Sequence, residues 1–461
     1  MATATDVVRS INPSNGELLA TYPLQDAEQL EAALSRASRA FGSWRRTSIS
    51  ERADGLVRLA AALRADAAQF SAMISSEMGK PIVQAQAEVE KTAAMAEWYA
   101  AHAERILAPE PTTVDGNKAW IEYRPLGPIL AVMPWNFPLW QVMRGAVPAI
   151  LAGNTYVLKH APNVMGSAYL LADAFKRAGL PEGLLEVTNL SNDQVSKVIV
   201  DDRIVGVTVT GSVRAGSAIG AQASAALKKS VLELGGSDAF IVLADADMEL
   251  AVDAAVRGRF QNTGQVCAAA KRFIIERSIL QEFTERFVEK VRALKMGDPA
   301  DPENYVGPMA RYDLRDELDG QVQRTIAEGA TLLLGGHKVE GDGNYYAPTI
   351  LADVRPGMTS FKEELFGPVA SIIAAQDANH AVTLANDSDF GLTASIFTSD
   401  ENLARHMAAE LDVGGVFVNG YSASDVRVGF GGVKKSGFGR ELSHFGVREF
   451  TNAQTVWFDR R

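Results

Sequence analysis

The apolar residues in the first quarter of the chain recur at the spacing of amphipathic helices. From Asp26 to about Ala108 the pattern is helical throughout, and one helix is predicted to begin at Ser48-Ile-Ser-Glu51, which has the form of a capping box. The apolar side chains that follow share one face, namely Leu56, Leu59, Leu63, Phe70 and Ile74. We therefore expect a helical scaffold ahead of any sheet.

After Tyr123, short apolar runs alternate with helical stretches. The first group of runs covers 129–133, 155–158, 184–187, 205–209 and 231–234, and the second covers 240–243, 273–275, 331–334, 395–397 and 416–418. Such alternation is typical of βαβ units in a parallel sheet, so two α/β domains are predicted. The last segment, Glu449 to Phe458, is strand-like, and we expect it to pair away from these domains, with another subunit's sheet as one option.

Composition narrows the class of protein. A chain of 461 residues with 47% hydrophobic content suits two or three packed domains. The net charge of −11 and the scattered lysines and arginines argue against nucleic acid or an anionic membrane as a partner. The first residues lack the apolar core of a signal peptide, and no apolar run approaches the ~18 residues of a membrane span, so a cytoplasmic protein is expected.

Cysteine and histidine usage limits the available chemistry. Cys267 is the only cysteine, so neither an intramolecular disulfide nor a metal site made from a pair of cysteines is expected. The six histidines show neither HExxH nor HxH spacing, which disfavours a zinc hydrolase. We expect chemistry without a metal.

A glycine-rich turn, Thr210-Gly211-Ser212 with Gly216 and Gly220, follows the run at 205–209. Glycines where a strand becomes a helix let the backbone approach a pyrophosphate, whose charge the helix N-terminus stabilises. The turn matches neither GxGxxG nor a P-loop, so an ordinary βα turn is about as probable until other residues are considered.

Three further segments carry candidate chemistry. In Gly264-Gln-Val-Cys267, the thiol follows a turn between a predicted helix and a predicted strand, where neighbouring donors can favour its thiolate. A lone cysteine is otherwise more often a small core residue.

Glu233 lies in an apolar strand before paired glycines, where burial should raise its pKa as a general base requires. The alternative is that Glu233 caps a nearby helix or forms a salt bridge with it. Asn136, between Pro134 and Pro138, can offer an amide N–H to an oxyanion, or the loop is simply rigid.

Taken together and in order, these motifs resemble the aldehyde dehydrogenase superfamily over nearly the whole chain. Glu233 precedes Cys267 by 34 residues, and Glu364 follows it by 97, as in that family. The resemblance implies that Cys267 is the nucleophile and that Asn136 with the Cys267 backbone N–H forms the oxyanion hole. Glu233 would activate the water that hydrolyses a thioester, and Glu441 matches a second carboxylate that relays protons.

The resemblance also implies a cofactor, NAD or NADP. Lys159 matches a lysine at the adenosine ribose, Gly211 and Ser212 match the pyrophosphate loop, and Trp135 lines the same cleft. Glu364 and Phe366 match the residues at the nicotinamide ribose and ring. Where the family usually continues Lys-Pro-Ser-Glu, this chain has Lys159-His-Ala-Pro162, which removes the glutamate that repels a 2′-phosphate, so NADP should be tolerated.

The longer stretches resemble bacterial NAD(P)-linked succinate-semialdehyde dehydrogenases. Arg144 lies where that group has an arginine for the distal carboxylate, unless it makes a structural salt bridge on its helix. The usual second arginine is replaced by Gln261, so a second charge would come from Arg427, ranked first, or from Arg259. Other aldehydes remain alternatives, including glutarate semialdehyde and uncharged aliphatic ones, and so do a CoA-acylating enzyme and a catalytically silent homologue.

The fold implied by the resemblance is α/β, with a Rossmann-like dinucleotide-binding domain, an α/β catalytic domain and a small β oligomerisation element. The expected boundaries are 1–106 with 126–236, 237–440, and 107–125 with 441–461. A homodimer or homotetramer follows from the same resemblance. The small-molecule aldehyde and the cofactor would meet at Cys267 in the interdomain cleft.

Overall fold

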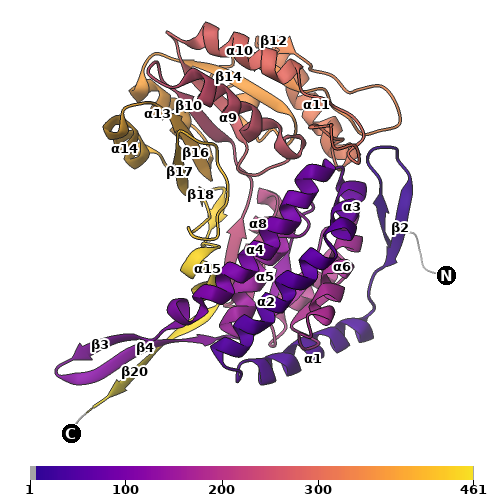
Figure 1. Cartoon of the computed structure of the whole chain (residues 1–461), viewed down its shortest axis with the longest axis vertical. Helices are drawn as coiled ribbons and strands as arrows, with labels where there is room; N and C mark the ends of the chain where they lie inside the picture. Colours follow the sequence, from indigo (N-terminus) through magenta and orange to yellow (C-terminus); the bar gives the residue numbers. More distant parts are fainter. Residues whose placement is uncertain (1–6, 460–461) are drawn as a thin grey trace.

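A computed structural model describes residues 7–459 of the chain. It begins with a hairpin and a helical layer, which lie on the lower right in Figure 1. The predicted capping box at Ser48 is confirmed, but the predicted apolar face is divided between two helices that meet at Asp66. All five apolar side chains of that face are buried in one core. The bounds are β1 Val7–Ile11, β2 Leu18–Pro23, α1 Ala27–Trp44, α2 Ile49–Ala65, α3 Ala67–Met78 and α4 Ile82–Leu107.

The first large sheet has six strands in the order β19-β9-β8-β5-β6-β7, parallel except for β19. The helices α2 to α6 cover one face, while α1, α7 and α8 cover the other. The strands are β5 Pro128–Val132, β6 Thr155–Lys159, β7 Leu185–Thr188, β8 Gly206–Thr210, β9 Lys229–Glu233 and β19 Gly437–Phe438; the helices are α5 Trp140–Ala152, η1 Pro162–Val164, α6 Met165–Arg177, α7 Asn192–Val200 and α8 Val213–Ala225.

One strand of the first sheet comes from the far end of the chain. The short β19 pairs antiparallel with β9, so that Gly437 lies opposite Glu233. Sequence analysis grouped residues 237–440 as a single domain, and the structure corrects this for β19. The Gly437 backbone has a φ of +109°. A Cβ on Gly437 would lie 1.9 Å from the carbonyl oxygen of Leu232, so only glycine fits at this position.

The second sheet forms the upper lobe and has the order β12-β13-β14-β11-β10-β16-β17, parallel except for β12 (Figure 1). Two buried cores lie on its two faces. The strands are β10 Asp238–Val242, β11 Ala270–Glu276, β12 Thr331–Leu334, β13 Thr349–Ala352, β14 Val369–Ala375, β16 Thr393–Phe397 and β17 Gly415–Val418; the helices are α9 Met248–Phe260, η2 Gln261–Gly264, α10 Leu280–Arg292, α11 Tyr312–Ala327, α12 Thr359–Lys362, α13 Ala378–Asn386 and α14 Glu401–Glu410.

A three-stranded arm projects from the lower lobe (Figure 1). Its order is β20-β4-β3, so the C-terminal strand pairs with β4 of its own chain along eight residues. The bounds are β3 Glu110–Val114, β4 Asn117–Pro125 and β20 Thr451–Phe458; the remaining elements are β15 Phe390–Gly391, β18 Val433–Lys434 and α15 Ser443–Glu449. Among residues 7–459, no helix has the length and apolar character needed to cross a membrane.

Candidate active site

Cys267 lies in the loop between α9 and β11, as the sequence predicts. The chain reaches it through three consecutive residues with positive φ: Asn262 (54°), Thr263 (55°) and Gly264 (70°). Such a conformation is costly for residues other than glycine and needs support from neighbours. The Asn262 N–H donates to the Gln84 side chain at 2.7 Å, and the Thr263 hydroxyl donates to the Gly307 carbonyl at 3.1 Å. These contacts hold the half-buried thiol at the amino end of β11.

Asn136 is joined directly to the Cys267 loop. Its side-chain Nδ2 donates to the Gln265 carbonyl at 2.9 Å, and its own carbonyl accepts from Asn262 at 2.8 Å. Asn136 is 3% exposed, and its Nδ2 has a second N–H besides the one that bonds Gln265. The arrangement therefore suits the oxyanion role that the sequence assigned to Asn136.

A buried ion pair fixes the loop that carries Asn136. The Glu88 carboxylate on α4 accepts from the backbone N–H groups of Leu139 and Trp140, at 2.9 and 3.0 Å, and pairs with Lys80. The Lys80 ammonium lies 3.7 Å from the centre of the Phe137 ring. Because α5 has no capping side chain of its own, Glu88 stabilises its first turn. Sequence reasoning missed both residues, since no local pattern links α4 to this loop.

Glu233 ends β9 between β8 and β19. Glu233 is 2% exposed, and neither of its carboxyl oxygens has a hydrogen-bond partner of good geometry among the described residues. Burial raises the pKa of Glu233 to about 8, although the Arg144 guanidinium at 3.9 Å pulls it down. The predicted rise in pKa is thus confirmed. A helix-capping role does not fit, but the salt bridge that the sequence left as an alternative is present, to Arg144 of the nearby helix α5.

Arg144 brings Glu233 and Glu441 together. It is buried on α5, its Nε pairs with the Glu441 carboxylate, and its guanidinium lies 4.9 Å from the centre of the Phe430 ring. Burial also raises the pKa of Glu441, against the pull of Arg144. The salt bridge that the sequence left as an alternative for Arg144 is therefore present, and it belongs to the site rather than to the surface of a helix.

The thiol of Cys267 is protonated near neutral pH. Burial raises its pKa to about 11, and the positive charges of Arg144 and Lys271 only partly oppose this effect. The expectation that neighbouring donors favour the thiolate was wrong for this state, because loss of hydration outweighs the nearby cations. Lys271, another residue that the sequence reasoning did not assign, donates to the Cys267 carbonyl at 2.6 Å.

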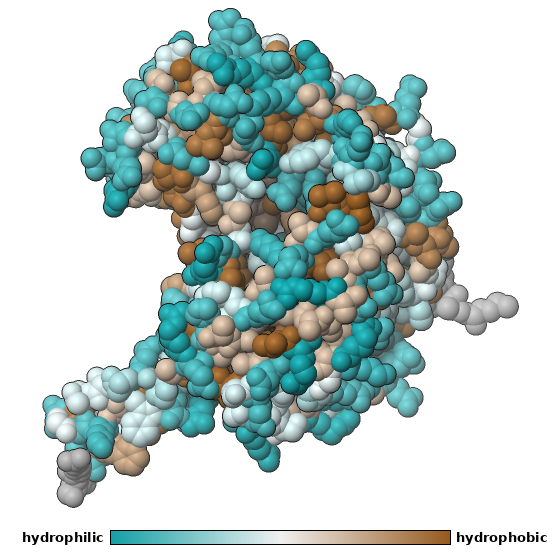
Figure 2. Space-filling model, viewed as in Figure 1, coloured by the Kyte–Doolittle hydropathy of each residue, from teal (hydrophilic) through white to brown (hydrophobic). Residues whose placement is uncertain are grey.

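Three predicted cofactor residues lie around the cleft near Cys267. The rings of Trp135 and Phe366 meet edge to face at 5.7 Å. The Glu364 carboxylate accepts from the Gly236 N–H at 3.0 Å and pairs with Lys271 at 3.4 Å. Figure 2 shows the surface hollowed between the two lobes.

The other predicted cofactor residues lie at the carboxyl edge of the first sheet, where dinucleotides bind in such folds. Ser212 caps α8 through its hydroxyl, which accepts from the Ala215 N–H at 3.3 Å. No atom lies within 4 Å of where a Cβ of Gly211 would stand, so space is open beside this helix terminus. Lys159 ends β6, and burial lowers its pKa. This set can accommodate a pyrophosphate and an adenosine ribose.

The segment after Lys159 carries no acid. His160 is buried, where its Nδ1 accepts from the Ala161 N–H and its Nε2 donates to the Pro138 carbonyl, both at 2.9 Å. Burial lowers the pKa of His160 to about 4, so the ring is neutral. Pro162, at the position of the family's glutamate, is exposed. This environment presents no negative charge to a 2′-phosphate.

The candidate cations for the substrate are placed very differently. Arg427 is exposed on its loop and is paired with Asp425 at 2.7 Å. Arg259 is completely buried and donates to backbone carbonyls, including that of Leu365 at 2.9 Å. The structure therefore excludes Arg259 as a second carboxylate ligand. Gln261 is half-buried at the end of α9 and carries no charge.

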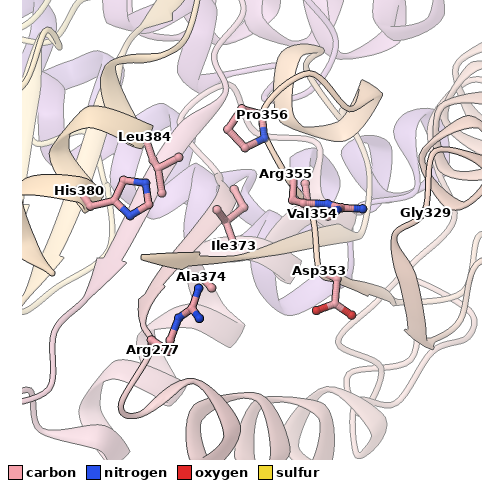
Figure 3. A pocket seen from close by; sticks show the side chains of 10 residues that line it. All are labelled: Arg277, Gly329, Asp353, Val354, Arg355, Pro356, Ile373, Ala374, His380 and Leu384. Atoms are coloured by element: carbon pink, nitrogen blue, oxygen red, sulfur yellow. The ribbon is translucent and has the colours of Figure 1, made fainter. Parts of the chain in front are cut away.

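A pocket of about 550 Å³ lies away from these residues, at the other end of β11 (Figure 3). Arg277 follows β11 directly, whereas Cys267 precedes it. The pocket contains none of the predicted site residues; its lining is Arg277, Gly329, Asp353, Val354, Arg355, Pro356, Ile373, Ala374, His380 and Leu384.

A thiol beside a buried base, between a dinucleotide-type sheet and a second α/β lobe, is the arrangement of an enzyme that oxidises aldehydes through a thioester. Comparison with known proteins agrees: the chain belongs to the aldehyde dehydrogenase family, which it matches over residues 1–456.

Two relatives and one solved structure are each named as a succinate-semialdehyde dehydrogenase. The chain is 65% identical over 451 residues to succinate semialdehyde dehydrogenase (NAD(P)+) Sad of Escherichia coli strain K12, covering 98% of each chain. It is 44% identical over 453 residues to succinate-semialdehyde dehydrogenase (NADP(+)) 1 of Mycobacterium bovis, covering 98% of this chain and 99% of the relative. A crystal structure of succinic semialdehyde dehydrogenase from Streptococcus pyogenes in complex with NADP+ superposes with a TM-score of 0.96 at 36% identity, covering 98% of this chain and 100% of that one.

Proposed function

We propose that this enzyme oxidises succinate semialdehyde to succinate with NAD or NADP. The observation that carries the proposal is the convergence of Cys267, Asn136 and Glu233 in one buried site whose charges are set by Arg144. The names of the relatives support the substrate and the cofactor pair. The uncharged surroundings of Pro162 support use of the phosphorylated cofactor.

The proposed reaction has two halves. The Cys267 sulfur attacks the aldehyde carbon and releases its proton to solvent, and the oxyanion that forms accepts hydrogen bonds from the Asn136 amide and the Cys267 backbone N–H. NAD or NADP, held by the cofactor residues, would supply the hydride acceptor that formation of the thioester requires. Glu233 then takes a proton from water, whose oxygen attacks the thioester, so that the acid and the thiol are released. Glu441, paired with Arg144, is the proposed route for this proton.

On the cofactor side, the proposal keeps two groups of residues. Lys159, Gly211 and Ser212 would hold the adenosine ribose and the pyrophosphate, and Trp135, Glu364 and Phe366 would hold the nicotinamide half. On the substrate side, Arg144 is proposed to attract the distal carboxylate. The neutral Gln261 and the salt-bridged Arg427 favour a second candidate, a broader aliphatic aldehyde dehydrogenase.

The test is formation of NADH or NADPH with succinate semialdehyde and with butanal, each with NAD and with NADP. A kcat/KM at least roughly a hundredfold higher for the semialdehyde, about 2.7 kcal/mol, is expected if the distal carboxylate is recognised. Comparable values for the two aldehydes would select the broader activity. No reduction of either cofactor with any aldehyde would contradict both candidates.

We also propose a cytoplasmic homodimer or homotetramer that assembles through the arm. No strand within residues 7–459 pairs with the outer edge of β20, on which Trp457 and Phe458 are 51% and 57% exposed. An exposed apolar edge strand is a site for pairing with another chain. The free thiol of Cys267 supports a reducing compartment. Light scattering on the intact chain and on a variant lacking 451–461 tests the assembly: the intact chain should be oligomeric and the variant should dissociate.

A further inference from the structure

Recognition of a distal carboxylate needs more positive charge than the assigned arginines provide. The guanidinium of Arg144 is already shared between Glu441 and Glu233. That of Arg427 is paired with Asp425, and that of Arg259 is buried and donates to backbone carbonyls through its terminal nitrogens. If the enzyme distinguishes an aldehyde with a distal carboxylate from an uncharged aldehyde, a second cation without an ion-pair partner is therefore expected near the substrate.

Lys91, on α4, is such a cation. Its Nζ donates to the Ser424 hydroxyl at 3.1 Å and lies 4.1 Å from the centre of the Trp140 ring. No carboxylate lies within ion-pair distance of Lys91 in the described part of the chain, although the Asp425 and Glu88 carboxylates attract its charge from further away. A hydroxyl and an aromatic face leave the positive charge of the ammonium without a paired anion.

The contacts of Lys91 place it beside the substrate path. Trp140 and Arg144 are four residues apart on α5, so they lie on the same face of that helix, with roughly 5–6 Å between their Cβ atoms. Lys91 over Trp140 is thus near Arg144, which reaches Glu233. Ser424 lies on the same loop as Arg427, the cation that the sequence ranked first as a partner for the distal carboxylate.

The surroundings of Lys91 are those of a cleft wall rather than an open surface. Its side chain is exposed to solvent, yet enough protein surrounds it that loss of hydration, together with repulsion from Arg144, lowers its pKa to about 8. The indole N–H of Trp140, whose ring lies under the ammonium, is buried and has no hydrogen-bond partner among the described residues. Both features suit an anion that binds between α4 and α5.

We propose that Lys91 is the second cation that receives the distal carboxylate of the aldehyde, opposite Arg144 and in place of the arginine that Gln261 replaces. This inference rests on the proposed function and names the residue that sets its specificity. An incoming carboxylate would take the position of the Ser424 hydroxyl at Nζ. Lys91 makes no contact with Cys267, so it acts on binding and not on the chemical steps.

The test compares Lys91→Gln and Lys91→Arg with the parent enzyme on succinate semialdehyde and butanal. For Lys91→Gln we expect kcat/KM for the semialdehyde to fall at least tenfold, through KM, while the values for butanal stay within about twofold. Lys91→Arg should recover most of the loss, because the charge is kept. Unchanged turnover of butanal also shows that the variant is folded. Lys197→Gln, on the exposed side of α7, is the matched control.

The outcomes separate the two proposals. If the parent enzyme prefers the semialdehyde and Lys91→Gln keeps that preference, the role of Lys91 is overturned and the proposed function stands. Equal losses on both aldehydes would also overturn it, because they would indicate a structural role. If the parent enzyme shows no preference, both proposals fall together.

Discussion

The charge of Arg144 should control the pH at which the general base works. As the proposed base, Glu233 would activate water only when ionised; burial raises its pKa to about 8, so thioester hydrolysis should rise with pH through that value. At pH 7 only about one tenth of the molecules carry the ionised base. Arg144→Gln removes the cation that favours ionisation, and the pH profile should therefore move to higher pH.

The size of this shift follows from the geometry. The Arg144 and Glu233 charges are 3.9 Å apart. At an effective dielectric constant of about 20, that separation corresponds to about 4 kcal/mol, or about three pKa units. This is an upper bound, because Glu441 also loses its partner and can take up a proton instead. We expect a shift of one unit or more, which lowers hydrolysis at pH 7 at least tenfold.

The assay is rapid mixing with butanal and NAD between pH 6 and 10. Butanal has no distal carboxylate, so any role of Arg144 in substrate binding does not enter. The variant should show a burst of NADH followed by a slow steady state at pH 7, with the steady rate recovering at high pH. Arg405→Gln, on the exposed face of α14, is the control. A midpoint that stays near 8, or that moves to lower pH, would refute the electrostatic argument.

Three further predictions concern the thiol and the loop that faces it. Cys267→Ala should abolish NADH formation but retain dinucleotide binding in calorimetry, and residual turnover would remove the nucleophile assignment. Since burial raises the pKa of the Cys267 thiol to about 11, its alkylation by iodoacetamide should accelerate about tenfold per pH unit from 7 to 10; a plateau near pH 8 would contradict this. Glu88→Ala leaves Lys80 buried without a partner and should cost about 3–5 kcal/mol, seen as a lower Tm, whereas Lys80→Met with Glu88→Gln should recover much of it. An unchanged Tm in Glu88→Ala would show that the pair does not stabilise the fold.

Much of the architecture was predictable because its signals are local. The helical periodicity before Ala108, the capping box at Ser48 and the alternation after Tyr123 each depend on neighbours within a few residues. They gave the helical layer and the two sheets. The division at Asp66 escaped prediction, since an apolar face can continue across two helices that share one core.

The motifs around Cys267, Glu233 and Asn136 also identified the family and the rise in the pKa of Glu233 from sequence. A carboxyl in an apolar strand before paired glycines must lose hydration wherever the strand packs. The proposal of Cys267 as nucleophile likewise needed only the single cysteine and its spacing from the acid. These inferences depend on covalent neighbours and on burial alone.

The tertiary structure decided which charges meet. Arg144 lies on α5, yet its partners come from β9 and from a segment nearly three hundred residues later, so only the fold could show that it is paired. Only the fold could likewise show that Glu88 of α4 binds the first turn of α5 and that β19 pairs with β9. The proposed role of Lys91 could not be predicted from sequence, because it depends on which charged groups of other elements lie within ion-pair distance of its ammonium. Periodicity reports which face of an element is buried, whereas the pKa of a group and its freedom to bind depend on charges and distances set by segments remote in sequence.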